Sequence, residues 1–100
     1  MTAPSIPTFF GRMSAFQIAE SKTFCQRKQQ IDFALYERIK SIVYPQLKKN
    51  PFCGPSIRQL TGELTGYYRF RIGDYRLLYL VEEKQAVVAI VALQLVRRAA

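Results

Sequence analysis

Between residues 31 and 47 the hydrophobic side chains recur at steps of three and four residues, which is the period of an α-helix. They are Ile31, Leu35, Ile39, Ile42, Val43 and Leu47. Charged and polar residues fill the positions between them, so the pattern predicts an amphipathic helix with one buried face. Pro45 has no backbone N–H and must weaken the last helical turn. The Asn50 and Pro51 pair then ends the helix.

Upstream of this helix the pattern predicts a short strand and a second helical segment. Apolar residues alternate with small or polar ones across residues 15–19, as in a short β-strand. Ser21 offers a side-chain oxygen as the N-cap of a helix that begins at about Lys22. The pattern leaves open whether residues 22–47 form one bent helix or two helices joined near Gln30.

The second half of the chain changes to the two-residue period of β-strands. Residues 67–72 and 75–81 are rich in aromatic and branched side chains. Gly73 and Asp74 lie between them and suit a two-residue hairpin turn, because Gly accepts a positive φ. We therefore predict a tight β-hairpin.

The segments on either side of this hairpin complete the predicted sheet. Residues 86–95 are almost all apolar and predict a strand that is buried on both faces. Residues 56–65 predict a loop or short extended chain in which Leu60 and Leu64 are buried. The order of strand, helical segment and three strands predicts an α+β fold, with a small antiparallel-rich sheet of about four strands and the N-terminal helices packed on one face.

One hundred residues, nearly half of them hydrophobic, suffice for a single domain with one modest core. We expect this domain to span residues 13–100 and a flexible arm to precede it over residues 1–12. No apolar run reaches the roughly 18 to 20 residues that cross a bilayer, and residues 1–12 lack the apolar core of a signal peptide. These features favour a cytoplasmic protein with no membrane partner.

The net charge and the residue types present restrict the partners and reactions that this chain can support. Fifteen Lys and Arg against seven Asp and Glu give a net charge of +8, which favours an anionic partner such as nucleic acid, an anionic membrane surface or an acidic protein. The chain has no histidine, and Cys25 and Cys53 stand alone. The usual metal ligands and the usual acid–base group at neutral pH are therefore missing, and we expect neither a metal nor a cofactor.

The predicted hairpin carries three arginines on one face of the sheet. If the two-residue turn forms, Arg71 lies directly opposite Arg76, and Arg69 shares their face because side chains alternate along a strand. Like charges about 5 Å apart repel by roughly 3 kcal/mol at an effective dielectric constant of 20. An anion between them reverses the sign, since the guanidinium fork matches phosphate geometry. The alternative is a solvated face on which the arginines splay apart or pair with Glu63 and Asp74.

Tyr67 shares the arginine face and is a candidate to stack on a nucleic-acid base. Tyr68, Phe70, Tyr75 and Tyr79 lie on the opposite side by alternation, so we expect them to be core residues. The basic side chains of the helical region are individually solvated, and collectively they suit contacts with RNA phosphates. They are Lys22, Arg27, Lys28, Arg38, Lys40, Lys48 and Lys49.

Three segments resemble the RelE/ParE superfamily of bacterial type II toxins. They are the Asn50 and Pro51 pair, residues 60–79 with the sequence LTGELTGYYRFRIGDYRLLY, and the apolar residues 87–93. The similarity covers roughly residues 31–93. It implies a microbial-RNase-like fold and a toxin that a cognate antitoxin holds inactive.

The resemblance also implies roles for single residues. RelE-type members cut mRNA in the ribosomal A site, where a basic pair on the first hairpin strand and an arginine opening the second act on the scissile phosphate. Arg69, Arg71 and Arg76 match these positions, which implies catalytic roles for them and the ribosome and mRNA as partners. Active members follow the last strand with a basic residue or histidine and then an aromatic. Here Arg97 or Arg98 is left to supply the cation, and nothing replaces the aromatic.

Arginine suits only part of this chemistry. It stabilises the charge that develops on phosphorus, but its pKa above about 12 makes it a poor acid or base at neutral pH. Glu63 is the nearest candidate base in the sequence, although a loop carboxylate is more often solvated or paired with an arginine. Cleavage would therefore depend on positioning and charge stabilisation, with the ribosome or the RNA supplying orientation.

Three functions stay open at this point. The arginines favour a ribosome-dependent mRNA endoribonuclease, which is our leading prediction. The missing terminal aromatic and the absence of histidine favour a ParE-like toxin that inhibits DNA gyrase without cutting RNA. The third is an inactive member that binds only an antitoxin.

Overall fold

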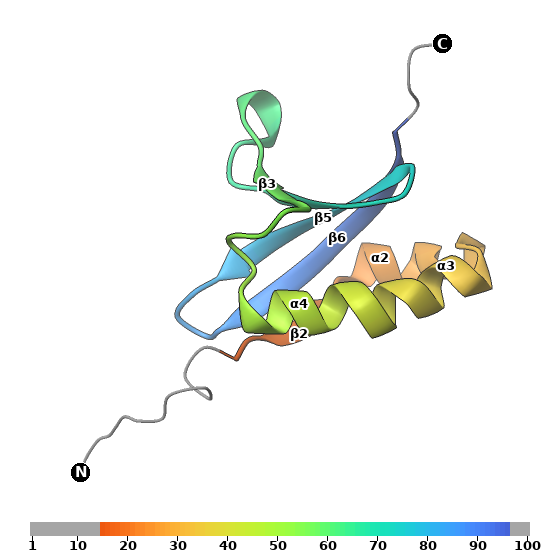
Figure 1. Ribbon diagram of the computed structural model, residues 1–100, viewed down its shortest axis with the longest axis horizontal. Coiled ribbons are helices and arrows are strands. Elements are labelled where there is room, and N and C mark those ends of the chain that lie inside the picture. Colours follow the sequence, from red (N-terminus) through yellow and green to blue (C-terminus); the bar gives the residue numbers. More distant parts are fainter. Residues whose placement is uncertain (1–14, 97–100) are drawn as a thin grey trace.

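The computed structural model describes residues 15–96, so the predicted arm over residues 1–12, Arg97 and Arg98 lie outside the described residues. Figure 1 shows the predicted α+β arrangement, with helices below a twisted sheet. The elements are β2 Gln17–Glu20, α2 Lys22–Arg27, the 3₁₀ turn η1 Lys28–Gln30, α3 Phe33–Arg38, the π-turn η2 Ile39–Val43, α4 Tyr44–Lys49, β3 Ile57–Gln59, the 3₁₀ turn η3 Gly62–Leu64, β4 Tyr68–Ile72, β5 Tyr75–Glu82 and β6 Val87–Leu95. Within residues 15–96, no helix has the length and apolar character that crossing a bilayer requires.

The helical layer consists of two segments that each begin at their own side-chain cap. The Ser21 hydroxyl accepts a hydrogen bond from the backbone N–H of Phe24 at 3.1 Å, which confirms the predicted start of α2. The Asp32 carboxylate caps α3 by accepting from the N–H of Leu35 at 3.2 Å. Between the two caps the chain passes through η1 and an extended Ile31 with φ −82° and ψ 137°. This break answers the question that the hydrophobic pattern left open near Gln30.

A π-turn joins α3 to α4 and changes which side chains face the core. The N–H of Tyr44 donates to the carbonyl of Ile39, five residues back, immediately before Pro45. The wider turn lowers the rotation per residue, so that Tyr44 is carried to the buried side together with Val43. Ile42, which the helical period placed in the buried stripe, is 46% exposed. That prediction was wrong because the period of 3.6 residues does not hold through this turn.

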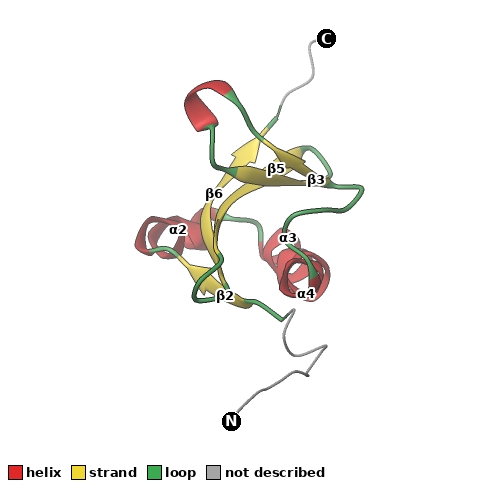
Figure 2. Ribbon diagram, turned by 90° about the vertical axis from the view of Figure 1, so that its left-hand side faces the viewer, coloured by secondary structure: helices red, strands yellow, loops and turns green. Residues whose placement is uncertain are grey.

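The sheet has five strands in the order β2-β6-β5-β4-β3, one more than predicted. β2 runs parallel to β6, and the other neighbours are antiparallel. The additional strand is β3, a three-residue edge strand inside the segment predicted as loop or extended chain. Figure 2 shows how strongly the sheet twists from β2, at the bottom, to β3, at the top.

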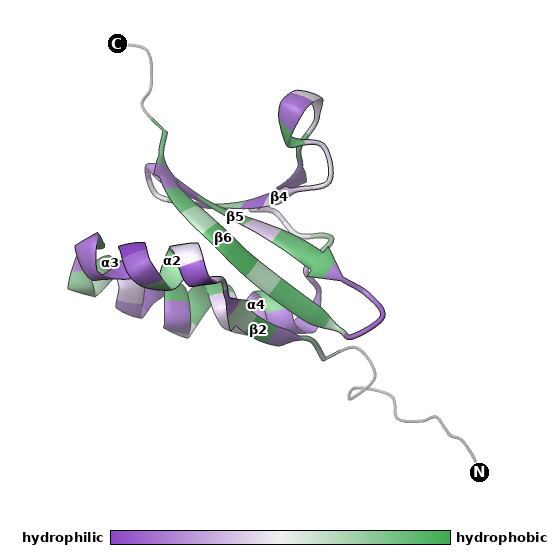
Figure 3. Cartoon of the chain, turned by 180° about the vertical axis from the view of Figure 1, so that it is seen from behind, coloured by the Kyte–Doolittle hydropathy of each residue, from purple (hydrophilic) through white to green (hydrophobic). Residues whose placement is uncertain are grey.

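Three burial predictions need correction. Leu60 and Leu64 are only half-buried, because the chain around η3 lies beside the sheet rather than under the helices. β6 is a central strand but is not buried on both faces: Val88 and Ile90 are fully buried, while their neighbours along the strand are partly exposed. Figure 3 shows β6 as mostly hydrophobic and β4 as the strand with hydrophilic positions.

The core lies between the helices and one face of the sheet. Its helical members are Phe24, Ile39, Val43, Tyr44 and Leu47, and its sheet members are Phe70, Ile72, Leu77, Tyr79, Val88 and Ile90. Each large apolar side chain buried in this way contributes roughly 1.5 to 3 kcal/mol. Tyr79 is fully buried, and its hydroxyl donates to the carbonyl of Pro51 at 2.7 Å, so the core ties the hairpin to the loop after α4.

One carboxylate connects the strand β2 to both helical segments. Glu20 accepts hydrogen bonds from Lys28 Nζ at 3.0 Å, the Tyr36 hydroxyl at 2.6 Å and the Tyr44 hydroxyl at 2.8 Å. Burial by itself would raise the pKa of Glu20, but the three donors and the charge of Lys28 outweigh it and hold the pKa below its ordinary value. Burial and the neighbouring Glu20 raise the pKa of both tyrosines. The charged carboxylate is therefore part of the folded structure.

We expect Glu20→Gln to lower the free energy of unfolding by about 1 to 3 kcal/mol, because an amide accepts these bonds less strongly and loses the ion pair with Lys28. The lowered pKa of Glu20 adds stability that is complete above the ordinary glutamate pKa of about 4.3 and is lost as the pH falls through the folded-state value. Urea unfolding at pH 7 and at about pH 3 measures both effects, and the variant should lose less stability on acidification than the parent chain. The control is Glu37→Gln, which removes an exposed pair with Lys40 and should change stability by less than about 0.5 kcal/mol. Equal losses in the two variants would contradict the role given to Glu20.

Candidate functional site

The hairpin forms in the predicted register. Gly73 has a φ of 59°, and the pair Gly73 and Asp74 connects β4 directly to β5. Arg71 is paired with Arg76, and Arg69 is paired with Leu78. Since Phe70 and Leu77, on the other side of the same strands, are core residues, the three arginines lie on the face turned away from the helices.

The guanidinium groups diverge from one another and bind neutral acceptors. Arg69 Nη1 donates to the carbonyl of Ser56 at 2.7 Å, and Arg71 Nε donates to the carbonyl of Gly73 at 3.0 Å. Arg76 Nε donates to Gln94 Oε1 at 2.7 Å, across β5 and β6. The structure thus combines a common face with splayed head groups, and an anion over that face meets donors from three directions.

No carboxylate neutralises these arginines within residues 15–96. The ion pairs of that region are Lys28 with Glu20 and Lys40 with Glu37. Glu63 and Asp74, the partners considered from the sequence, are both exposed and take no part in an ion pair among the described residues. The positive charge of the face is therefore available to an external anion.

A fourth arginine lies on the same face and was missed from the sequence. Arg58 of β3 is paired with Arg69, and its own side chain is exposed. Burial lowers the pKa of Arg69, and the charges of Arg58, Arg71 and Arg76 lower it further, in that order. The only sequence signal was the alternation of Ile57, Arg58 and Gln59, which is too short to predict a strand. We call Arg58, Arg69, Arg71 and Arg76 the arginine face.

The other predicted site residues divide into three groups. Tyr67 directly precedes β4 and is half-buried; its N–H donates to Leu64 and its carbonyl accepts from Leu60, so its backbone closes the loop beside the arginine face. Lys48 and Lys49 end α4 on the helical side of the sheet, so the structure does not bring them to the arginine face. Arg97 and Arg98 lie outside the described residues. Figure 1 shows that the loop with η3 and the end of β6 both rise on the side away from the helices.

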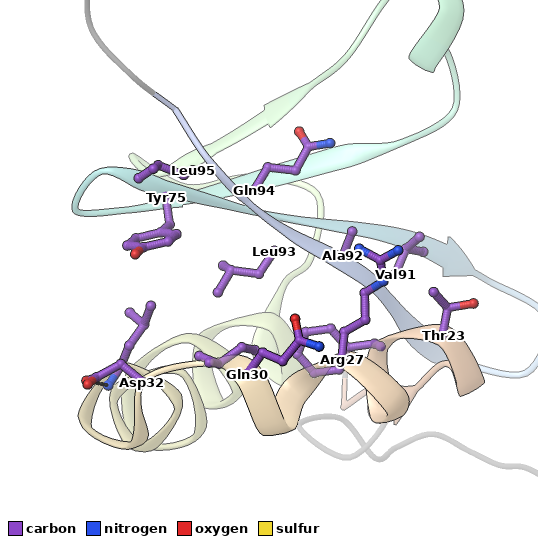
Figure 4. Close-up of a pocket in the computed structure, with 13 residues that line it drawn as sticks. Thr23, Arg27, Gln30, Asp32, Tyr75, Val91, Ala92, Leu93, Gln94 and Leu95 are labelled. Carbon is purple, nitrogen blue, oxygen red and sulfur yellow. Dashed lines mark hydrogen bonds between the residues drawn. The ribbon is translucent and has the colours of Figure 1, made fainter.

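A hollow of about 390 Å³ lies on the other side of β6, between its end and the helices. In Figure 4, Tyr75 and Leu93 point into it from the sheet, whereas Gln94 points away from it, toward the face where it binds Arg76. Arg27 and Asp32 line its helical side. The hollow is thus separated from the arginine face by the sheet itself.

A mixed five-stranded sheet with helices packed on one face is also the fold of RelE-type toxins of known structure. The RelBE2 toxin–antitoxin complex from Mycobacterium tuberculosis matches with a TM-score of 0.72 at 20% identity, over 81% of this chain and 98% of that chain. The archaeal RelE–RelB complex from Pyrococcus horikoshii matches with a TM-score of 0.69 at 29% identity, over 85% and 99%. The isolated RelE toxin of E. coli matches with a TM-score of 0.69 at 17% identity, over 85% and 88%.

Residues 17–99 match the family described as the ParE toxin of the type II toxin–antitoxin system parDE. The chain therefore belongs to this family and is a type II toxin of the RelE/ParE superfamily, as its hairpin sequence indicated. Among curated proteins, a search finds no match to this chain.

Unneutralised arginines should make the stability of the fold depend on anions. Raising the ionic strength from about 10 mM to about 0.5 M should stabilise the protein by up to about 1 kcal/mol, because salt screens the repulsion across the face. Phosphate should stabilise it more than chloride at equal ionic strength, since the guanidinium fork binds it directly. Thermal unfolding in the two salts measures the difference.

The matched variants are Arg71→Gln on the arginine face and Lys84→Gln in the exposed turn between β5 and β6, which remove the same charge. Arg71→Gln should reduce the difference between phosphate and chloride, and Lys84→Gln should keep it. An undiminished difference in Arg71→Gln would show that phosphate acts through general salt effects.

Proposed function

We propose that this toxin is a ribosome-dependent mRNA endoribonuclease that inhibits translation in the cytoplasm. The observation that supports it best is the arginine face, where Arg69, Arg71 and Arg76 share one side of the sheet with no carboxylate partner among the described residues. These are the positions at which RelE-type members hold the scissile phosphate. The match of 29% identity to an archaeal RelE over almost the whole length of that chain supports the same branch.

The proposed reaction is attack of a ribose 2′-oxygen on the adjacent phosphorus, with departure of the 5′-oxygen. Arg71 and Arg76 approach from neighbouring strands and are placed to stabilise the negative charge of the pentavalent phosphorane. Arg69 is half-buried and donates to the Ser56 carbonyl at 2.7 Å, which suits it to position the RNA backbone beside the scissile phosphate. Arginine does not give up its proton at neutral pH, so these side chains supply positive charge and hydrogen-bond donors but no transferable proton.

The proton that leaves the 2′-hydroxyl and the proton that reaches the 5′-oxygen must therefore travel through other groups. The chain has no histidine, and Glu63 is exposed in η3 without a contact to a hairpin arginine. We assign these transfers to water or to groups of the ribosome, which also holds the mRNA in place. The protein should accordingly be slow on free RNA.

A second candidate function is inhibition of DNA gyrase without RNA cleavage. It is favoured by the family description as a ParE toxin. On either candidate, the natural partner is a cognate antitoxin. We propose that an acidic antitoxin segment covers the arginine face, because carboxylates there remove the repulsion between Arg71 and Arg76.

We expect Arg76→Ala to abolish growth arrest and to lower mRNA cleavage on the ribosome by at least about 100-fold, as loss of a donor to a developing oxyanion does in other enzymes. The fold should persist, because Arg76 is paired only with surface groups. Translation rate and the mapped 5′ ends of transcripts after induction measure the effect. Lys84→Ala removes an equal charge from the exposed turn between β5 and β6 and should stay toxic.

The same experiment separates the candidates. New 5′ ends within coding sequences, lost in Arg76→Ala, support the endoribonuclease. Arrest of replication with translation intact supports gyrase inhibition instead. Retained toxicity when Arg69, Arg71 and Arg76 are all replaced by alanine would overturn the endoribonuclease proposal.

A further inference from the structure

We propose that Arg58 and Arg69 form a second phosphate subsite, beside the one formed by Arg71 and Arg76. This rests on the proposed RNA substrate and extends it: the toxin grips two consecutive phosphodiesters of one strand. Arg58 has no counterpart among the residues that the resemblance assigned to catalysis. Its position in the sheet is what brings it to the site.

The arginine face consists of two cross-strand pairs. Arg58 is paired with Arg69 across β3 and β4, and Arg71 is paired with Arg76 across β4 and β5. Directly opposite residues have Cβ atoms about 5 Å apart. Arg69 and Arg71 are two residues apart on β4, which separates the pairs by roughly 7 Å along the strand. Each pair presents two guanidinium groups, so the face offers two adjacent positions for anions of the same kind.

Both pairs are unfavourable in the empty protein. Like charges placed directly opposite each other destabilise a sheet. After burial, the charge of Arg58 is the largest of the causes that lower the pKa of the half-buried Arg69. Arg69 cannot turn away freely, because its guanidinium is bonded to the Ser56 carbonyl at 2.7 Å. A phosphate between Arg58 and Arg69 changes this repulsion into two attractions.

The competing explanation is that Arg58 protects an exposed sheet edge. β3 is the outermost strand, and charged residues at such edges prevent pairing with another chain. A glutamate at position 58 would protect the edge equally and would also form an ion pair with Arg69. Edge protection and stability therefore do not explain why this residue is an arginine. Phosphate binding does explain the arginine, since only a cation attracts an anion and the guanidinium group binds a phosphate through two donors.

Both explanations allow Arg58→Glu to keep its stability, and they differ in the RNA affinity that they predict for it. We expect this variant to melt at or above the temperature of the parent chain, because it replaces a repulsive pair by an attractive one. We also expect it to bind RNA far more weakly. A protein that is more stable and binds less cannot have lost binding through unfolding.

The binding probe is a single-stranded, 2′-O-methylated RNA of about ten nucleotides, which resists attack by a 2′-hydroxyl. Fluorescence anisotropy over a series of salt concentrations gives the affinity and the slope of log K against log salt. Arg58→Gln should bind about tenfold more weakly at low salt, and the magnitude of its slope should fall by about 0.7 for one lost phosphate contact. Arg58→Lys should keep the slope and lose part of the affinity, and Lys84→Gln, in the exposed turn between β5 and β6, should match the parent chain.

The outcomes distinguish this subsite from the function on which it rests. If Arg58→Gln binds like the parent chain while Arg71→Gln and Arg76→Gln bind weakly, the second subsite is wrong and the endoribonuclease proposal stands. If none of the three variants changes the affinity or the slope, both proposals fall. If Arg58→Gln and Arg71→Gln each lower the slope and the double variant lowers it by about twice as much, two separate phosphates are held as proposed.

Discussion

The alternation of side chains across β4 and β5 is the constraint on which the rest of this molecule depends. Phe70, Leu77 and Tyr79 must be buried under the helices, and this requirement leaves the opposite face to their neighbours along each strand. A shift of one residue in the register would bury Arg71 and expose Phe70. The burial of the core therefore holds like charges together on the other face, at a cost in repulsion that the apolar contacts exceed.

The distribution of acidic residues explains why this face remains positive. Glu20 joins β2 to both helical segments, Asp32 caps α3, and Glu37 pairs with Lys40 on the helix surface. Glu82 accepts from the backbone N–H of Lys84 in the turn before β6. The chain has only seven acidic residues, and these four make contacts in the helical layer and turns. Arg69, Arg71 and Arg76 donate instead to neutral carbonyl and amide oxygens. Hydrogen bonds to neutral acceptors position the guanidinium groups and leave their positive charge unneutralised, as the proposed anion site requires.

This arrangement divides the work between two faces of one sheet. The helical side provides stability through the core and the Glu20 hydrogen bonds, and in the proposed function the arginine face binds the substrate. Because β3 adds Arg58 to the edge of that face, recognition extends beyond a single phosphate to the neighbouring one in the inference drawn above. The charges serve positioning and electrostatic stabilisation, and a chain without histidine has little else to offer a reacting phosphate.

Local patterns by themselves predicted the hairpin register, the N-cap at Ser21 and the placing of Arg69, Arg71 and Arg76 on one face, because turns, caps and two-residue alternation act between near neighbours. They also predicted a helical segment over residues 31–47, which the structure shows from Phe33 to Lys49. They failed at Ile42, where a π-turn before Pro45 altered the helical period, and at β3, which exists only because β4 lies beside it. Pairing of β3 with β4 places Arg58 on the arginine face, and packing of α4 on the other side of the sheet places Lys48 away from it. Both contacts join distant parts of the chain. Whether two charges meet across a sheet depends on which strands pair, and only the tertiary structure decides that.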